Sequence, residues 1–278
     1  MSDQNTTAVP GMIAGVEFLG KRALAMLETI GSAWYLLLDA SVWLVRGITQ
    51  KRVRIGKQAI VSQLVRVGVR SIFIISLVSG CVGFILALQM APPLDKFGSK
   101  DLVANITGVA IFRELGPLIA AIVLTGFAGA AIAAEIGTMV VGEEIEALEA
   151  HALNPVRFLV VPRVIATVIS MTCLAVLADL VAVTAGWAVG VTILGIPSER
   201  YVQNLLDQVQ LVDFLTGVGK GTIFGLLIGL IACNNGLRVT GGAAGVGAAT
   251  TNTVVQSIVA IVVADLIFTG VFYATGLV

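Results

Sequence analysis

Five long stretches of this chain are almost free of charged residues. The first, from Ser71 to Met90, holds no charge, and the others, over 102–134, 164–196, 214–237 and 254–278, hold at most two each. A helix needs about 20 mostly apolar residues to cross the hydrocarbon core of a bilayer. The pattern predicts an all-α polytopic membrane protein with five transmembrane helices, and this odd number places the two termini on opposite sides of the membrane.

A further apolar segment, over 34–45, is too short to span a bilayer and is interrupted by Asp39. It carries Trp34, Tyr35 and Trp43, and aromatic side chains of this kind gather at the boundary between lipid and water. We expect this segment to form a helix that lies in the membrane interface.

The distribution of lysine and arginine gives the orientation, because basic residues in short loops are retained in the cytoplasm. Twelve basic residues fall on the side of the N-terminus and three on the other side. The twelve are Lys21, Arg22, Arg46, Lys51, Arg52, Arg54, Lys57, Arg66, Arg70, Arg157, Arg163 and Arg238, and the three are Lys96, Lys100 and Arg200. The N-terminus is therefore expected in the cytoplasm.

The composition is that of a protein whose solvent is a bilayer. Hydrophobic residues make up 57% of the chain and charged residues 12%, whereas soluble domains carry about 25% charged residues. The net charge is zero, so no overall field draws the chain toward nucleic acid. Cys81, Cys173 and Cys233 stand apart in apolar runs, and we expect three small core residues that form neither a disulfide nor a metal site.

Five ionisable residues fall inside the predicted spans, namely Arg113, Glu114, Asp179, Lys220 and Asp265. Inserting an Asp, Lys or Arg at the centre of a membrane helix costs about 2.5–3.5 kcal/mol, so such residues usually face a cavity or a partner. Asp179 and Asp265 can each pair with Lys220 on a neighbouring helix. From the sequence, a structural pair and a functional role are equally supported for these three residues.

Arg113 and Glu114 are adjacent, so they point about 100° apart on a helix and need separate partners. They fall early in a span that runs toward the cytoplasm, and hence in the outer half of the membrane. An arginine there can hold a lipid phosphate through its fork of donors. An interhelical structural pair is the equally supported alternative.

The outer end of the first span is a second candidate for lipid contact. Pro92 and Pro93 are expected to break the helix near the level of Arg113. Four apolar residues around this level would line an opening through which acyl chains enter. They are Leu86, Leu94, Phe97 and Leu115.

Nucleotide binding and hydrolysis are not expected of this chain. The segment 217–222, Gly-Val-Gly-Lys-Gly-Thr, is similar to the end of a phosphate-binding loop. That pattern requires glycine where Phe214 stands and serine or threonine where Gly221 stands. The single histidine, His151, lies away from the intramembrane carboxylates in sequence, so no Ser-His-Asp site is expected.

The segment 142–154, between the second and third spans, has helical periodicity. Apolar residues recur on one face and glutamates on the other faces, and the helix is expected to end at Asn154-Pro155. The apolar residues are Val141, Ile145, Leu148 and Ala152, and the glutamates are Glu143, Glu146 and Glu149. The pattern predicts a short amphipathic helix at the cytoplasmic surface.

Short motifs follow one another along the chain from Arg113 onward in a recognisable order. They are Arg113-Glu-Leu-Gly-Pro117, Ala134-Glu-Ile-Gly137, Glu143-Glu144 with Glu149, Asn154-Pro155, Pro162-Arg163, and a C-terminal set of Gly241 to Thr251, Val254-Val255 and Asp265. In these motifs the chain resembles the MlaE/YrbE permease family. We expect a disordered N-terminus (1–10), cytoplasmic and interfacial helices (11–62) and a permease domain (63–278).

The resemblance implies an ABC transporter permease of a bacterial inner membrane that moves lipids. It implies a homodimer or pseudo-dimer, a separate ATPase that binds ATP and magnesium, and a periplasmic MCE-domain protein that exchanges lipid with the permease. It also implies that the segment 142–154 is a coupling helix that contacts the ATPase. The residues expected at this contact are Glu143, Glu144, Ile145, Leu148 and Glu149. No cofactor is expected on this chain itself.

Two other classes of function fit parts of the sequence. A proton-driven secondary carrier would use Asp179 and Asp265, although such carriers often contain internal repeats and we detect none here. A membrane anchor for an MCE-domain protein would leave the amphipathic segment 142–154 without a role. Co-purification with an ATPase distinguishes the three classes.

Overall fold

A computed structural model describes residues 9–49 and 56–276, and this part of the chain contains helices and turns but no strand. Within it, five helical stretches are long and apolar enough to cross a membrane. They are Lys57–Lys96, Lys100–Val141, Val156–Thr192, Leu211–Leu237 and Gly242–Thr275. The five predicted spans are confirmed. Each observed helix begins earlier than predicted, because polar residues at the ends of a span are tolerated in the interface.

The first two spans consist of several consecutive helical segments. Span 1 comprises α2 (Lys57–Val67), η1 (Val69–Ser71) and α3 (Ile72–Lys96). After the short turn η2 (Lys100–Leu102), span 2 comprises α4 (Val103–Ala110), η3 (Ile111–Leu115), α5 (Gly116–Leu124), η4 (Thr125–Gly129) and α6 (Ala130–Val141). Both η3 and η4 are π-helical turns.

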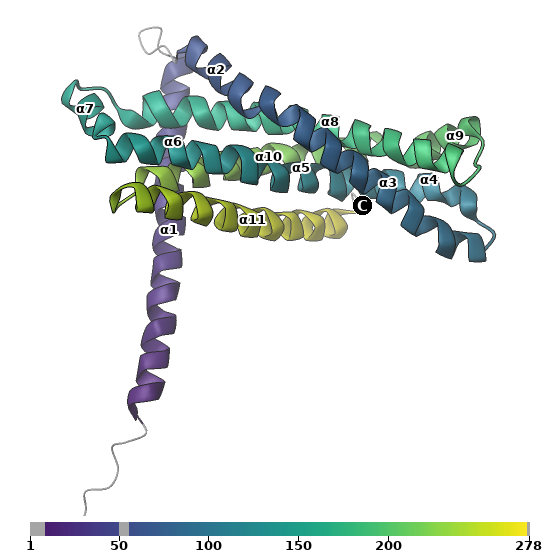
Figure 1. Cartoon of the computed structure of the whole chain (residues 1–278), viewed down its shortest axis with the longest axis horizontal. Coiled ribbons are helices and arrows are strands. Elements are labelled where there is room, and N and C mark those ends of the chain that lie inside the picture. Colours follow the sequence, from purple (N-terminus) through teal and green to yellow (C-terminus); the bar gives the residue numbers. More distant parts are fainter. Residues whose placement is uncertain (1–8, 50–55, 277–278) are drawn as a thin grey trace, which may run out of the picture.

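The other three spans follow a short loop helix. The loop helix is α7 (Glu144–Ala150), and span 3 comprises η5 (Val156–Val160) and α8 (Val161–Thr192). A short helix, α9 (Ser198–Gln208), connects it to α10 (Leu211–Leu237) and α11 (Gly242–Thr275). The spans therefore run between an end that carries α7 and an end that carries α9, as Figure 1 shows.

Pro92 and Pro93 do not break α3, contrary to our expectation, and the helix continues to Lys96. Two prolines remove two N–H donors from the helix. Both prolines are exposed and lie close to the end of the helix, so only about one helical turn follows them. The expected break is therefore wrong.

Span 3 lies at the centre of the bundle, with α8 packed along both α3 and α10. Two glycines permit the closest approaches. A Cβ atom on Gly83 of α3 would stand 2.0 Å from the carbonyl oxygen of Ala182, and one on Gly225 of α10 would stand 2.7 Å from the Cβ of Met171. Small residues at such contacts let membrane helices pack closely in lipid.

The N-terminal helix α1 (Val9–Thr49) runs across the bundle near the α7 end, and its first half projects beyond the spans (Figure 1). Its 41 residues make it much longer than the predicted segment 34–45. The second half packs on the main core through residues that include Leu36, Ala40 and Trp43. Its position in the membrane interface remains a prediction.

Residues 1–8, within the expected disordered segment, and 50–55 lie outside the described residues. Cys81 and Cys173 are exposed and only Cys233 is buried. The expectation of three core cysteines is wrong for the first two, because lipid is as apolar as the protein core and an apolar run does not reveal which residues face it.

A second, smaller core fixes α9 against the ends of α3, α4 and α8. Its largest side chain is Tyr201, which is buried and lies against Gly190 of α8. Burial raises the pKa of the Tyr201 phenol above its ordinary value of 10.0, and a hydrogen bond with Thr107 lowers it in part. The phenol is therefore protonated at neutral pH. Its packing in this second core holds the connection between spans 3 and 4 in place.

Candidate functional site

A π-helical turn, η3, places Arg113 and Glu114 within span 2. Pro117 follows in the first turn of α5 and has no N–H group, so the carbonyl of Arg113 lacks its ordinary partner four residues later. The neighbouring carbonyl of Phe112 lies against α10, where a Cβ atom on Gly217 would stand 2.0 Å from its oxygen. Turns of this kind widen a helix and are frequent at functional sites.

Lys220 of α10 is the centre of an ion-pair network that joins three spans. Its ammonium nitrogen lies 2.7 Å from Glu114 Oε1 and 3.0 Å from Asp265 Oδ1 of α11. It also donates a hydrogen bond of 2.9 Å to Thr269 Oγ1, which donates one of 2.9 Å to Glu114. The Lys220 side chain is 1% exposed, so the two carboxylates supply the charge compensation that water supplies elsewhere.

Arg113 forms a separate ion pair with Asp213 at the start of α10. Asp213 also accepts a hydrogen bond of 2.9 Å from the backbone N–H of Gln210, as part of a capping box. Only Nε of Arg113 is engaged, since the two Nη groups have no recorded hydrogen bond to any described residue. The guanidinium is thus anchored by one edge, and the other edge is available to an anion.

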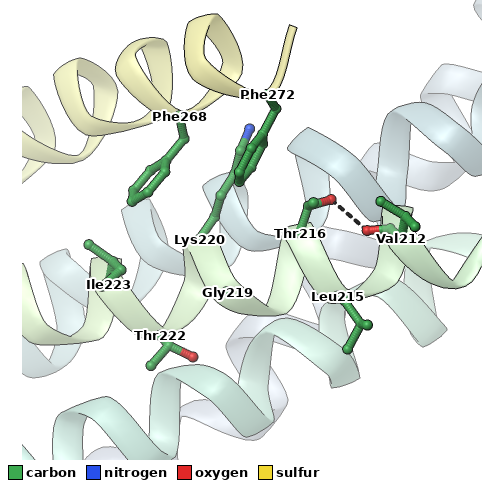
Figure 2. A pocket seen from close by; sticks show the side chains of 9 residues that line it. All are labelled: Val212, Leu215, Thr216, Gly219, Lys220, Thr222, Ile223, Phe268 and Phe272. Carbon is green, nitrogen blue, oxygen red and sulfur yellow. Dashed lines mark hydrogen bonds between the residues drawn. The ribbon is translucent and has the colours of Figure 1, made fainter. Parts of the chain in front are cut away.

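An open pocket of about 520 Å³ lies beside this network, between α10 and α11 (Figure 2). It is lined by Val212, Leu215, Thr216, Gly219, Lys220, Thr222, Ile223, Phe268 and Phe272. The rings of Phe268 and Phe272 stack with centroids 5.9 Å apart, and the Lys220 ammonium lies 5.9 Å from the centroid of Phe272. The pocket is therefore apolar, with one cation at its wall.

Asp213, Thr269 and the two pocket phenylalanines were not predicted from the sequence, although the spacing along α11 contains a signal. Asp265, Phe268, Thr269 and Phe272 recur at intervals of three and four residues, which places them on one face of a helix. A helix face that carries a charge and a hydroxyl among aromatic residues indicates the wall of a pocket. A face that contacts only lipid would be apolar throughout.

The four apolar residues predicted to contact lipid lie elsewhere. Leu86 and Leu94 are half-buried in α3, and Leu94 packs against the second core. Phe97 is exposed just beyond α3, and Leu115 is half-buried at the end of η3. None of the four lines the pocket. Their contact with acyl chains remains a prediction.

Asp179 of α8 does not join Lys220, so of the two pairings considered the structure contains only the one with Asp265. It is buried, and neither carboxylate oxygen has a hydrogen-bond partner among the described residues. The carboxyl group packs directly on Gly116 at the start of α5, where a Cβ atom would stand 1.6 Å from Oδ1. Asp179 therefore contributes to the contact between spans 2 and 3 and not to the network.

The loop helix α7 is shorter than the predicted 142–154, because residues in the left-handed region stand on both sides of it. Glu143 has φ +58° and Ala152 has φ +57°. Ile145 and Leu148 are half-buried, and Ile145 packs against the main core, whereas Glu143, Glu144 and Glu149 are exposed. The apolar stripe of α7, formed by Ile145 and Leu148, thus faces partly toward the bundle, and the carboxylates face outward. His151 caps the helix and is exposed.

Two of the motifs meet at the α7 end of the bundle. Glu135 of α6 pairs with Arg66 of α2 through one carboxylate oxygen, and with Arg163 of α8 at 3.0 Å through the other. Arg163 is buried and also donates a hydrogen bond of 2.8 Å to the carbonyl of Leu159. This cluster holds three spans together next to the loop helix, and it gives the Ala134-Glu-Ile-Gly and Pro162-Arg163 motifs a shared structural role.

The spans, the intramembrane ion pairs and the pocket between two spans define a polytopic helical membrane protein of the permease class. The chain belongs to the MlaE permease family, since the sequence model described as Permease MlaE matches residues 60–271. The family membership predicted from the short motifs is confirmed.

Several relatives align over most of this chain. A probable ABC transporter permease protein of Rickettsia typhi is 36% identical over 77% of this chain and 83% of its own length. The intermembrane phospholipid transport system permease protein MlaE of Haemophilus influenzae is 30% identical over 94% of this chain and 98% of its own. The chloroplastic protein TRIGALACTOSYLDIACYLGLYCEROL 1 of Arabidopsis thaliana is 31% identical over 86% and 69%.

Proposed function

We propose that this chain is the permease subunit of an ABC transporter that moves phospholipid between the inner membrane and a periplasmic MCE-domain partner. The observation that carries the proposal is the apolar pocket beside the Lys220 network, in a chain whose relatives include a phospholipid transport permease. Its volume falls within the range of small-molecule sites. Acyl chains would occupy the apolar part, and the phosphate would lie toward Lys220 and the free edge of Arg113.

A second copy of the chain would complete the site. α11 is the least buried of the five spans, and it forms one wall of the open pocket. Large apolar residues project outward along its length. They include Val255, Val259, Val262, Val263, Leu266, Ile267 and Val271, each about half exposed or more. Two copies packed along α11 would enclose the pocket and give a lipid-sized cavity between them.

This dimer predicts a specific cross-link. With Cys81 and Cys173 replaced by serine, Leu266→Cys is expected to give a covalent dimer on mild oxidation in native membranes, because Leu266 is 73% exposed on the proposed contact. The readout is a non-reducing gel. Leu180→Cys, which is 55% exposed on α8, is the matched control and should stay monomeric. Equal cross-linking of both variants, or of neither, would contradict the proposed contact.

ATP would be hydrolysed by a separate subunit bound at the α7 end, which the proposal assigns to the cytoplasm together with the N-terminus. ATP and magnesium would both belong to that subunit. The exposed glutamates of α7 would meet basic residues on the ATPase, and the edge of the apolar stripe would enter its surface groove. Glu143, Glu144, Ile145, Leu148 and Glu149 are the residues proposed for this contact.

Leu148→Arg is expected to abolish co-purification of the ATPase while the permease still inserts in the membrane, because a charge replaces the exposed part of the stripe. The control is Ala150→Arg, which places the same charge at an exposed position two residues further along α7. A pull-down with the folded permease checked by gel filtration provides the measurement. Retention of the ATPase by the Leu148 variant would exclude this docking mode.

The experiment that tests the whole proposal is a pull-down of the tagged chain in a mild detergent, followed by mass spectrometry of the proteins and lipids. An ATPase, an MCE-domain protein and bound phospholipid are expected together. Substrate transport by the chain alone, driven by a proton gradient, would replace the proposal with a secondary carrier. An MCE-domain protein without ATPase or lipid turnover would make the chain a membrane anchor.

A further inference from the structure

Asp179 lies near the middle of α8 and is not explained by the ion pairs beside the pocket. Its side chain is fully buried, and neither carboxylate oxygen accepts a hydrogen bond from a described residue. The four other intramembrane charges all form ion pairs. An ionised carboxylate in the place of Asp179 would lack both water and a donor, which is a costly arrangement inside a membrane protein.

The elements packed around Asp179 supply no countercharge. α4 and α5 contain no titratable residue, and in α3 the cysteine is exposed and the two charged residues stand at the end of the helix. In α8 itself, Arg163 pairs with Glu135 and Cys173 is exposed. The charges of η3 and α10 already have partners, which are Asp213 for Arg113, and Glu114 and Asp265 for Lys220.

The carboxyl group of Asp179 lies at the residue that closes the π-helical turn η3. Gly116 donates its backbone N–H to the carbonyl of Ile111, five residues earlier, and this bond is the one that defines a π-helical turn. A Cβ atom on Gly116 would stand 1.6 Å from Asp179 Oδ1 and 3.2 Å from the carbonyl oxygen of Ile111. The carboxyl group and this carbonyl therefore lie on the same side of Gly116.

The turn beside Asp179 carries the two charged residues that span 2 contributes to the ion pairs. Arg113 and Glu114 both lie in η3, and both reach partners on α10. A contact that fixes η3 also fixes the directions in which these two side chains leave span 2. Asp179 is thus placed to influence the ion pairs without touching them.

We propose that Asp179 binds a proton and, as a neutral carboxylic acid, donates a hydrogen bond to a backbone carbonyl of η3. A carbonyl oxygen has two lone pairs, so the carbonyl of Ile111 can accept this bond in addition to the one from Gly116. Asp179 is then a positioning residue for Arg113 and Glu114. The proton belongs to the folded structure and is not a coupling ion, because Asp179 is fully buried.

A metal cation would compensate an ionised Asp179 in a different way. Calcium and magnesium ions take about six or more oxygen ligands. Within residues 9–49 and 56–276, no group of three or more His, Cys, Asp or Glu side chains could hold a metal ion. These observations favour the proton. Spectroscopy distinguishes the two ligands, since only the protonated acid has the C=O stretching band of a carboxylic acid.

The first test is infrared spectroscopy of the purified full chain in detergent at neutral pH. The unchanged chain is expected to show a carboxylic acid band that Asp179→Asn lacks. The matched control is Asp101→Asn, which removes an exposed carboxylate paired with Arg200 and should leave the band in place. A carboxylic acid region that is identical in the unchanged chain and in Asp179→Asn would overturn the proposal.

The second test asks whether Asp179 acts on the ion pairs through η3. Lys220→Met is expected to lower the unfolding temperature less in an Asp179→Leu background than in the unchanged chain, because Glu114 is then no longer held beside Lys220. In an Asp179→Asn background the amide N–H can still donate to the turn, so the loss should be as large as in the unchanged chain. Equal losses in all three backgrounds would overturn the positioning role.

The consequence for transport rests on the proposed function, whereas the two tests above use the permease alone. ATP-driven lipid transfer is expected to survive in Asp179→Asn and to be lost in Asp179→Leu. Unchanged transfer by Asp179→Leu would overturn the positioning role. A chain that gives the expected infrared and unfolding results but neither binds an ATPase nor transfers lipid would leave the proton site standing and reject the transporter.

Discussion

Replacing Lys220 with methionine is expected to abolish lipid transport and to destabilise the permease by about 3–5 kcal/mol, the usual cost of removing one partner from a buried ion pair. Glu114 and Asp265 would then face each other without the cation that lies 2.7 and 3.0 Å from them. The wall of the transport pocket would lose its charge in the same step. Thermal unfolding in detergent and ATP-driven lipid transfer between liposomes measure the two effects.

The matched control for this substitution is Lys100→Met. Lys100 is 42% exposed and forms a single ion pair, 3.3 Å from Asp95, so its loss should cost about 0–1 kcal/mol. Adding Glu114→Gln and Asp265→Asn to Lys220→Met should recover stability, because no uncompensated charge remains, but should not recover transport. A Lys220 variant as stable as the Lys100 variant would show that the network is not a structural ion pair.

Gly217→Ala is expected to prevent accumulation of folded permease. A Cβ atom at this position would stand 2.0 Å from the carbonyl oxygen of Phe112, and that oxygen is backbone of a π-helical turn that carries both Arg113 and Glu114. Overpacking of this kind usually costs about 1–3 kcal/mol and more where backbone must move. The measurement is the yield of monodisperse protein by fluorescence-detected gel filtration.

Gly219→Ala provides a control two residues away on the same helix. A Cβ atom there has no neighbour within 4 Å, and alanine stabilises a helix by up to about 1 kcal/mol relative to glycine. Its yield should equal or exceed that of the unchanged chain. Similar yields for the two variants would mean that α10 and η3 are further apart than the structure places them.

The spans could be predicted from the sequence because the signal is strong and local. Runs such as 71–90 contain no charge, and a charge-free run of this length has few structural outcomes other than a membrane helix. The ionisable residues inside the spans could also be singled out as candidate site residues. Arg113, Glu114, Lys220 and Asp265 are costly to place in lipid and are surrounded in sequence by apolar residues. Four of the five intramembrane charges belong to the ion pairs beside the pocket.

The sequence offered two partners for Lys220, and the structure contains the pair with Asp265 but not the pair with Asp179. The choice between them, and the partners of Arg113 and Glu114, could not be predicted, because pairing depends on how helices from distant parts of the chain meet. Arg113 was considered for a lipid phosphate, and the structure also gives it Asp213, a residue placed outside the predicted span and therefore not considered. The pocket was missed for a related reason. In a membrane protein, apolar residues that line a cavity and those that face lipid have the same composition, and only a mixed face such as that of Asp265 and Phe268 distinguishes them.

The loop helix shows the limit of periodicity arguments. Its apolar spacing predicted a helix over 142–154, yet left-handed residues at Glu143 and Ala152 shorten it. Glycine or asparagine would have marked such positions, but a glutamate and an alanine give no local signal.

The two π-helical turns of span 2 make it a helix with adjustable register. Each turn, η3 and η4, accommodates one residue more than an α-helical path of the same length. Converting such a turn to α-helix would displace one residue and rotate everything beyond it by about 100°. At η3, that rotation would carry Glu114 away from Lys220 while the helix on either side stayed intact. Span 2 therefore contains two points at which the loss of one residue from a turn would change the neighbours of the rest of the helix without unwinding it.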